Sequence, residues 1–105
     1  MACLFCQIAN KKLPAEIIYQ DDKILALKDI KPLAPVHLLI MPKKHITSVA
    51  HLKTQDKPLM GELILAAKKI AQGKKLKGYK LQINVGRSAG QLINHLHLHL
   101  LSGKF

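Results

Sequence analysis

The chain has 105 residues, enough for one hydrophobic core, and we expect a single domain over residues 1–105. With 49% hydrophobic and 22% charged residues, its composition is that of a globular protein. No apolar run is long enough to cross a membrane and no signal-peptide pattern is evident, which predicts a cytoplasmic protein without a membrane partner. The net charge of +11 favours anionic partners without choosing among nucleotides, nucleic acids and acidic proteins. Because the basic residues are spread along the chain and no nucleic-acid motif accompanies them, a nucleic-acid partner is not expected.

The first half of the chain predicts a short helix followed by three strands. The helix ends by Lys12, before Pro14, and the strands cover residues 16–19, 24–28 and 36–42. The third strand is nearly all apolar, which is typical of a central strand covered on both faces, so His37 within it needs a polar partner. Asp29 closes the second strand beside a proline-bearing loop. Its carboxylate either caps that turn or accepts hydrogen bonds from a ribose diol.

The strongest helical pattern follows a brief turn capped by Thr47 or Ser48. The helix begins within residues 54–56, has Pro58 in its first turn, and ends at Gly73 or Gly78. Apolar residues recur three and four positions apart, which indicates packing on a sheet rather than a cofactor site. They are Leu59, Met60, Leu63, Ile64, Ala67, Ile70 and Ala71.

Histidine and leucine alternate over residues 95–100 and a second leucine follows at 101, which predicts a half-buried strand over residues 95–101. Alternate residues of a strand share a face, so His95, His97 and His99 lie on one side and the intervening leucines enter the core. A single histidine on a strand is commonplace. Here, however, half of the six histidines fall within five residues. We therefore expect a functional site, with a row of donors that faces an anionic ligand.

A glycine-bearing turn at residues 86–91 joins this strand to another expected at residues 79–85. The short connection predicts an antiparallel hairpin. Glycines in such a turn let backbone N–H groups approach a phosphate, and Ser88 and Gln91 could add side-chain hydrogen bonds. The spacing matches neither a Walker loop nor the dinucleotide fingerprint.

Cys3 and Cys6 form a C-x-x-C pair at the start of the chain. In a cytosolic protein such a pair is metal-binding or redox-active more often than a structural disulfide, although it can also be two unliganded thiols. Zinc needs four ligands and there is no second C-x-x-C. Histidines would have to supply the remaining two.

Residues 95–101 fit the H-φ-H-φ-H-φ-φ pattern of the histidine-triad (HIT) family, and the chain resembles its Hint branch. The likeness extends over nearly the whole chain, in order and spacing. It includes Cys3 to Cys6, Asp29-Ile30, Ala34-Pro35, His37, Pro42 to Ile46, Asn84 and Ala89 to Gln91. The resemblance implies an α+β fold with a five-stranded antiparallel sheet, one long helix and a short N-terminal helix. It also implies a homodimer with a continuous ten-stranded sheet.

The resemblance further implies a purine nucleotide-binding hydrolase that cleaves nucleoside 5′-phosphoramidates through a covalent nucleotidyl-histidine. His97 would be the nucleophile, His99 would bind a phosphate oxygen, and His37 and His95 would support protonation of His97. The nucleotide would be held by Asp29, Ile30, Asn84, Gly90, Gln91, His97 and His99. This chemistry needs positioning and charge neutralisation but no catalytic cofactor. A structural zinc would take Cys3, Cys6, His45 and His95, which conflicts with a proton-relay role for His95.

Several positions depart from the family pattern. Leu92 stands where relatives commonly carry a serine or threonine that binds phosphate, and Asn94 replaces an aromatic residue. Ser102 to Lys104 replace a Gly-Gly-Arg, and the chain stops at Phe105 where a tail often tunes specificity. These departures predict slower turnover or a different leaving group. The alternatives are a hydrolase of dinucleoside polyphosphates and a weakly catalytic nucleotide-binding scaffold.

Overall fold

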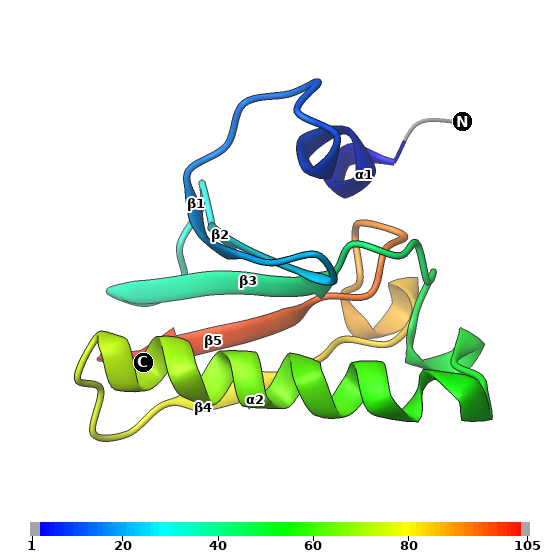
Figure 1. Cartoon of the computed structure of the whole chain (residues 1–105). Coiled ribbons are helices and arrows are strands. Elements are labelled where there is room, and N and C mark those ends of the chain that lie inside the picture. Colours follow the sequence, from blue (N-terminus) through cyan, green and yellow to red (C-terminus); the bar gives the residue numbers. More distant parts are fainter. Residues whose placement is uncertain (1–2, 104–105) are drawn as a thin grey trace.

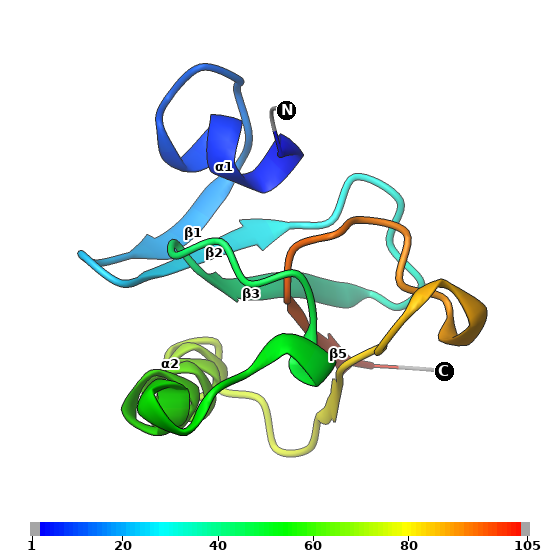
Figure 2. The ribbon, with the colours of Figure 1, turned by 90° about the vertical axis from the view of Figure 1, so that its right-hand side faces the viewer.

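A computed structural model describes residues 3–103 of the chain. The expectations for the N-terminal leader, for Lys104 and for the end at Phe105 therefore fall wholly or partly outside the described residues. One antiparallel sheet lies between a short helix on one face and a long helix on the other (Figure 1). Figure 2, seen from the side, shows the two helices on opposite sides of the sheet. Among the helices of residues 3–103, none is both long and apolar enough to cross a bilayer.

The sheet has five strands in the spatial order β1-β2-β3-β5-β4, and every neighbouring pair is antiparallel. The strands are β1 (Ile17–Gln20), β2 (Ile24–Lys28), β3 (Val36–Pro42), β4 (Lys80–Gln82) and β5 (Leu98–Ser102). The expected α+β fold with a five-stranded antiparallel sheet is confirmed. β3 occupies the centre and is buried at every position except Val36, as its apolar sequence predicts.

The helices are α1 (Leu4–Ala9) and α2 (Lys57–Gly73), with 3-10 turns at Val49–His51, Thr54–Asp56 and Arg87–Ala89. Pro58 lies in the first turn of α2 and Gly73 is its last residue, as expected. Ser48 caps the first 3-10 turn, since its hydroxyl accepts a hydrogen bond from the Ala50 N–H. One position of the predicted apolar stripe is wrong, because Ile64 is exposed. Leu63, Ala67, Ile70 and Ala71 are buried as expected, together with Ala66, and Leu59 and Met60 are half-buried against the same core.

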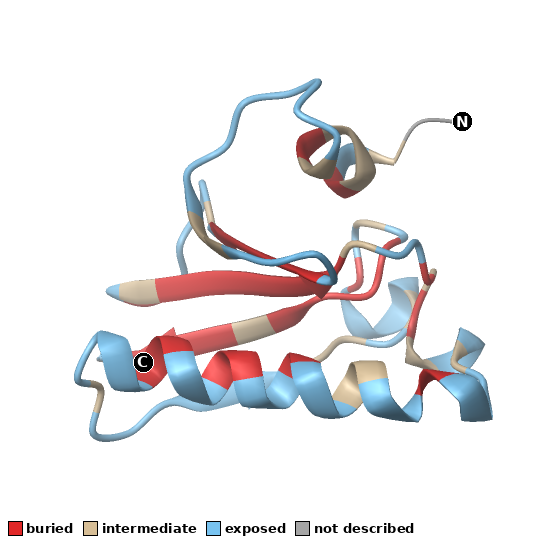
Figure 3. Cartoon of the chain, viewed as in Figure 1, coloured by how far each residue is buried: buried red, intermediate tan, exposed pale blue. Residues whose placement is uncertain are grey.

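Two apolar clusters occupy the two faces of the sheet. Figure 3 shows buried residues along β3 and β5 and on both helices. The larger joins α2 to the sheet and contains the leucines of the histidine segment, Leu96, Leu98 and Leu100. The smaller places Phe5 and Ile8 of α1 against apolar residues of β2 and β3. A two-residue strand period sends the leucines toward α2 and leaves the intervening histidines on the α1 side.

The strands of the predicted hairpin are shorter than the sequence pattern suggests. β4 covers three residues, and β5 begins at Leu98, so only His99 of the three histidines lies on a strand. The reason is local: the Leu96 N–H donates to the carbonyl of Ile46 at 2.7 Å rather than to β4. β4 and β5 are antiparallel neighbours, but residues 83–97 form a long excursion rather than a tight turn.

Two smaller boundaries also differ from expectation. The N-terminal helix ends at Ala9, short of Lys12, because the backbone at Lys11 turns left-handed with φ of 61°. The first strand begins at Ile17, one residue later than expected.

Candidate active site and metal site

Three imidazoles lie in a row on the α1 side of the sheet. His37 on β3 and His99 on β5 come from neighbouring strands, and their ring centroids are 5.1 Å apart. The ring of His97 is 5.0 Å from that of His99. The predicted shared face therefore holds for His97 and His99, although His97 precedes the strand.

Hydrogen bonds fix the tautomers of His37 and His99. The Leu33 N–H donates to Nδ1 of His37 at 3.0 Å, so the proton of a neutral His37 is on Nε2. That Nε2–H faces Nδ1 of His99 at 2.9 Å, which makes Nδ1 of His99 the acceptor. The remaining proton of His99 is then on Nε2. The chain of bonds ends in an N–H donor suited to a phosphate oxygen.

His37 is the buried polar residue for which the sequence required a partner. Its side chain is 1% exposed, and besides the bonds above it lies 3.3 Å from Oδ2 of Asp29. The other carboxylate oxygen of Asp29 accepts the Lys31 N–H at 2.8 Å. Asp29 thus caps the turn after β2, which is the first of the two roles expected for its carboxylate. Its remaining lone pairs leave room for ribose hydroxyls.

Burial, together with the neighbouring imidazoles of His97 and His37, lowers the pKa of His99 to about 4. His99 is therefore neutral across the physiological range and keeps one N–H and one acceptor nitrogen. The tautomer derived above is the one present at neutral pH.

His97 is held in the complementary tautomer. Its Nδ1 lies 2.7 Å from the backbone carbonyl of His95, and because a carbonyl can only accept, Nδ1 carries the proton. Nε2 then carries a lone pair, and no hydrogen bond within residues 3–103 occupies it. Every buried side-chain nitrogen and oxygen in that part of the chain has a partner, so Nε2 reaches the surface although the residue is only 7% exposed. His97 has the form of a nucleophile.

The phosphate-side loop at residues 86–91 is built around Gln91, which is buried. Its Oε1 accepts the Gly86 N–H, and its Nε2 donates to the carbonyls of Thr47 and Ile93. The amide is fully engaged inside the loop. Any contribution of Gln91 to phosphate binding is therefore made through the shape of the loop.

Asn84 and Gly90 meet at the open side of this loop. The amide of Asn84 lies 3.4 Å from the Gly90 carbonyl, and a Cβ at Gly90 would come within 3.2 Å of the same amide. Gly90 has φ of +93°, in the region that favours glycine. Its N–H donates to the Arg87 carbonyl, so Asn84 offers the more adaptable donor of the two.

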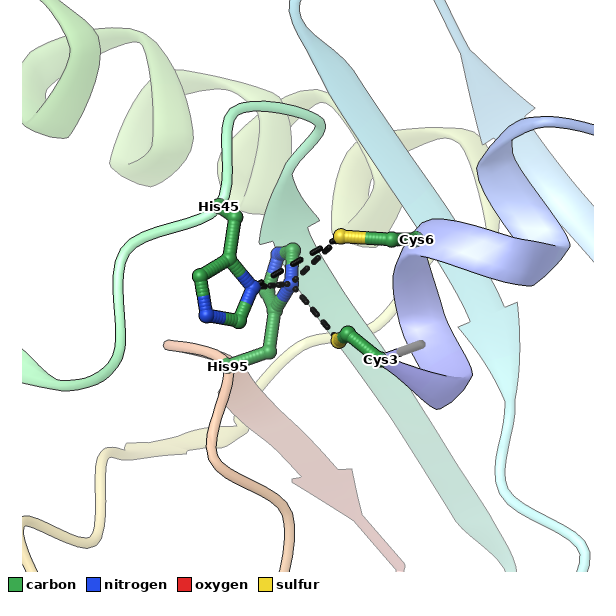
Figure 4. A group of neighbouring side chains, drawn as sticks. All are labelled: Cys3, Cys6, His45 and His95. Carbon is green, nitrogen blue, oxygen red and sulfur yellow. Dashed lines mark hydrogen bonds between the residues drawn. The ribbon is translucent and has the colours of Figure 1, made fainter. Parts of the chain in front are cut away.

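A second group of side chains joins α1 to the loops that precede β5 and follow β3 (Figure 4). Ligand atoms of Cys3, Cys6, His45 and His95 all lie within 4.8 Å of one another. Nδ1 of His95 is 3.3 Å from the sulfur of Cys3, 3.7 Å from that of Cys6 and 3.2 Å from Nδ1 of His45. The edges of a zinc tetrahedron with bonds of 2.0–2.3 Å are roughly 3.3–3.8 Å long. The spacing therefore fits zinc.

The donor chemistry of this cluster fits a cation as well. Nε2 of the buried His95 lies 2.7 Å from the Pro42 carbonyl and must donate to it, which leaves the lone pair of Nδ1 facing the cysteines. Burial and the hydrogen bond with Cys3 raise the pKa of Cys6, which means that the thiolate form of Cys6 is disfavoured in the protein alone. A cation bound between the two sulfurs would supply the positive charge that stabilises the thiolate form. The imidazole of His95 is directed into this cluster. Only its backbone carbonyl reaches His97.

Asp29, His37 and His99 also bring three ligand atoms within 4.8 Å of one another. The hydrogen bonds argue against a metal there. Nδ1 of His37 already accepts from the Leu33 N–H, so a metal on Nε2 would require an imidazolate. We interpret this group as a proton chain.

Sequence reasoning missed two participants. The ring of Phe5 meets those of His95 and His97 edge to face, at 5.7 and 5.2 Å. Leu33 acts through its backbone N–H. Phe5 stands between the two cysteines, which is a usable signal, whereas a backbone donor has no signature in the sequence.

Known proteins match this chain along nearly its whole length. A family model described as "Scavenger mRNA decapping enzyme C-term binding" matches residues 2–105. Protein HitA of Neisseria gonorrhoeae is 43% identical over 100 residues, which are 94% of each chain. A HIT-like protein of Buchnera aphidicola is 47% identical over 103 residues, 96% of this chain and 90% of the other.

Solved structures agree with this result. A HIT family hydrolase from Legionella pneumophila superposes with a TM-score of 0.96 at 45% identity, covering 99% of this chain and 95% of that one. A histidine triad protein from Clostridium difficile gives 0.95 at 37% identity, covering 100% and 93%. The chain belongs to the histidine-triad (HIT) family. Members of that family from Legionella pneumophila and Clostridium thermocellum are described as hydrolases, and a member from Candida albicans is described as a nucleotide-binding protein.

Proposed function

We propose that this protein is a Hint-type hydrolase that converts purine nucleoside 5′-phosphoramidates to the nucleoside monophosphate and an amine. The observation that carries the proposal is the hydrogen bond from Nδ1 of His97 to the His95 carbonyl, because it leaves the Nε2 lone pair available for attack. His99 presents an N–H beside it, where charge develops on a phosphate oxygen.

The reaction proceeds in two displacements. In the first, a bond forms between Nε2 of His97 and phosphorus while the phosphorus–nitrogen bond of the substrate breaks. The departing amine takes up one proton. That proton comes from solvent. In the second displacement, water attacks phosphorus, the bond between phosphorus and Nε2 of His97 breaks, and the attacking water loses one proton to solvent, so no net proton is consumed. His99, with its proton on Nε2 through the bond from His37, stabilises the phosphoryl oxygens in both steps.

The nucleotide would lie between the Asp29 turn and the loop at residues 86–91. Asp29 retains lone pairs for the ribose hydroxyls, and Ile30 beside it is 90% exposed, an apolar surface for a purine base. The Asn84 amide and the Gly90 backbone would face the phosphate side, with Gln91 holding the loop in shape. Leu92 is 73% exposed at the place where relatives carry a phosphate-binding hydroxyl, which favours an apolar substituent on the leaving amine.

Cys3, Cys6, His45 and His95 would hold a zinc ion, and no bond of the substrate would form or break on it. Zinc would cross-link α1 to the loops that follow β3 and precede β5. We also propose a homodimer in which β4 of one copy pairs with β4 of a second copy, so that the two sheets become continuous. β4 is an edge strand with three exposed residues, and the edge of a sheet can pair with a strand of another chain. Analytical ultracentrifugation checks this assembly, and a monomer at micromolar concentration would refute it.

The decisive experiment traps the intermediate. The protein is mixed with a radiolabelled adenosine 5′-phosphoramidate and quenched within milliseconds to seconds, and the modified peptide is located by mass. A nucleotide mass on His97 supports the mechanism, and a label on another residue overturns it. His97→Ala should abolish turnover and keep nucleotide binding. Preference for a dinucleoside polyphosphate would assign the other hydrolase class, and absence of turnover in the parent protein would indicate a nucleotide-binding scaffold.

A further inference from the structure

The Cys3, Cys6, His45 and His95 cluster and the His97 nucleophile are joined by two short physical connections. One is covalent and hydrogen-bonded: the ring of His95 is in the cluster, and its backbone carbonyl accepts the Nδ1–H of His97 at 2.7 Å. The other is a packing contact. Phe5 lies in sequence between Cys3, the N-cap residue of α1, and Cys6, and it touches the rings of both His95 and His97.

The helix that carries the cysteines cannot hold its position by itself. α1 has six residues, too few for an isolated helix to be stable in water. Only Phe5 and Ile8 of this helix are buried, and its N-cap residue Cys3 makes no side-chain capping bond. The cluster is thus a major anchor between α1 and the rest of the protein. Whatever loosens it also loosens the Phe5 ring against His97.

The segment that presents the His95 carbonyl is held on either side of His95, by the hydrogen bond from Gln91 to the Ile93 carbonyl and by Leu96 in the core. Residues 93–97 lie outside the strands, and the hydrogen bonds that shape them run from His95 N–H to the Ile93 carbonyl and from Leu96 N–H to the Ile46 carbonyl. The ring of His95 is a further attachment, held by the Pro42 carbonyl on one side and by the cluster on the other. The orientation of the carbonyl therefore depends on the cluster.

We propose that the metal cluster is a positioning device for the nucleophile: cation binding by Cys3, Cys6, His45 and His95 fixes the orientation and tautomer of His97. This inference rests on the proposed function, in that it takes His97 as the nucleophile and zinc as the cation. His95 and Phe5 are positioning residues, since neither reaches the substrate. Loss of the cation lets the carbonyl turn away, so the proton of His97 can move to Nε2 and remove the attacking lone pair.

The test uses the full chain, labelled with ¹⁵N-histidine, with and without equimolar Zn²⁺ after treatment with a chelator. Ring ¹⁵N shifts report the tautomer of His97, and bound zinc is measured by mass spectrometry. We expect one Zn²⁺ per chain and Nδ1–H for His97 in the zinc form. Without zinc the Nε2–H form should appear, with kcat for the phosphoramidate about 10–100-fold lower and KM little changed. A purely structural metal would leave the His97 tautomer as it is.

Two variants and a control separate positioning from general loss of stability. Cys6→Ser removes one ligand and should reproduce the chelated state even in excess zinc. Phe5→Leu keeps all four ligands and should bind zinc while lowering kcat a few-fold. The control is Ile70→Ala. Ile70 lies beside Ile18 and Tyr19, at the β1 edge of the sheet. This substitution should lower the unfolding midpoint without changing the His97 tautomer or kcat.

The outcomes distinguish this inference from the proposed function. Zinc binding with turnover, but with an unchanged His97 tautomer and kcat on chelation, overturns the positioning role and leaves the hydrolase standing. Absence of zinc binding overturns the inference as well. A zinc-dependent tautomer in a protein that hydrolyses no phosphoramidate supports the positioning device and refutes the proposed activity. If Ile70→Ala shifts the tautomer as much as Cys6→Ser, general destabilisation explains the effect and the inference fails.

Discussion

His37 offers the sharpest test of the proton chain, because its two ring nitrogens have different partners. Nδ1 accepts the Leu33 N–H at 3.0 Å and Nε2 donates to His99 at 2.9 Å. The oxygen of an asparagine at this position can replace Nδ1, and the amide of a glutamine can replace Nε2. His37→Asn therefore keeps the Leu33 bond and loses the His99 bond, while His37→Gln does the opposite.

Both variants should lose stability by similar amounts. Each leaves one polar group unpaired, at about 1–3 kcal/mol, and each shortens or reshapes a side chain that is 1% exposed. Their activities should differ strongly. His37→Gln keeps the donor that sets the tautomer of His99, so kcat/KM should stay within about tenfold of the parent. His37→Asn leaves that tautomer unset, and a mis-set tautomer can cost about 100-fold or more.

The assays are urea unfolding for stability and steady-state hydrolysis of an adenosine 5′-phosphoramidate for rate. Ring ¹⁵N shifts of His99 give a third readout that does not depend on activity. Equal kcat/KM values for the two variants would refute the reasoning. So would a His99 that keeps its proton on Nε2 in His37→Asn.

Three further outcomes follow from single features of the structure. Lys75 holds φ of 57° in the turn that ends α2, so Lys75→Gly should raise the unfolding free energy by about 0.5–1 kcal/mol in urea titration. Gln91→Ala leaves the three hydrogen-bonding partners of the Gln91 amide unpaired. It should lower the unfolding free energy by about 2–3 kcal/mol and speed amide exchange at residues 86–91. The pKa of His99 falls from 6.5 to about 4 on folding, so the unfolded chain binds more protons between those values, and stability should fall as the pH is lowered from about 6.5 to about 4. The full effect is about 3 kcal/mol, and partial exposure of the ring reduces it to about 1–2 kcal/mol. A shallower pH profile in His99→Gln than in the parent protein confirms the assignment, and equal slopes contradict it. Some slope remains in the variant, because burial also lowers the pKa of His95.

Local patterning was sufficient for most of the fold. The apolar run at 36–42 identified the central strand, and the spacing of apolar residues from Leu63 to Ala71 identified the face of α2 that packs on the sheet. The alternation at 95–101 correctly divided leucines from histidines between the two faces. It gave the wrong strand start, because the Leu96 N–H donates to the Ile46 carbonyl outside the sheet, and periodicity carries no information about such a partner.

The sequence by itself determined which residue types would meet: a histidine row backed by leucines, and a cysteine pair in need of two more ligands. Only the tertiary structure decided which atoms they use. It turned the ring of His95 toward Cys3 and Cys6 and its carbonyl toward His97, so that one residue can serve both the metal cluster and the nucleophile. The protonation of these rings is set by backbone groups of Leu33, Pro42 and His95. Every residue carries such groups, so their positions follow from the path of the folded chain and leave no trace in the sequence.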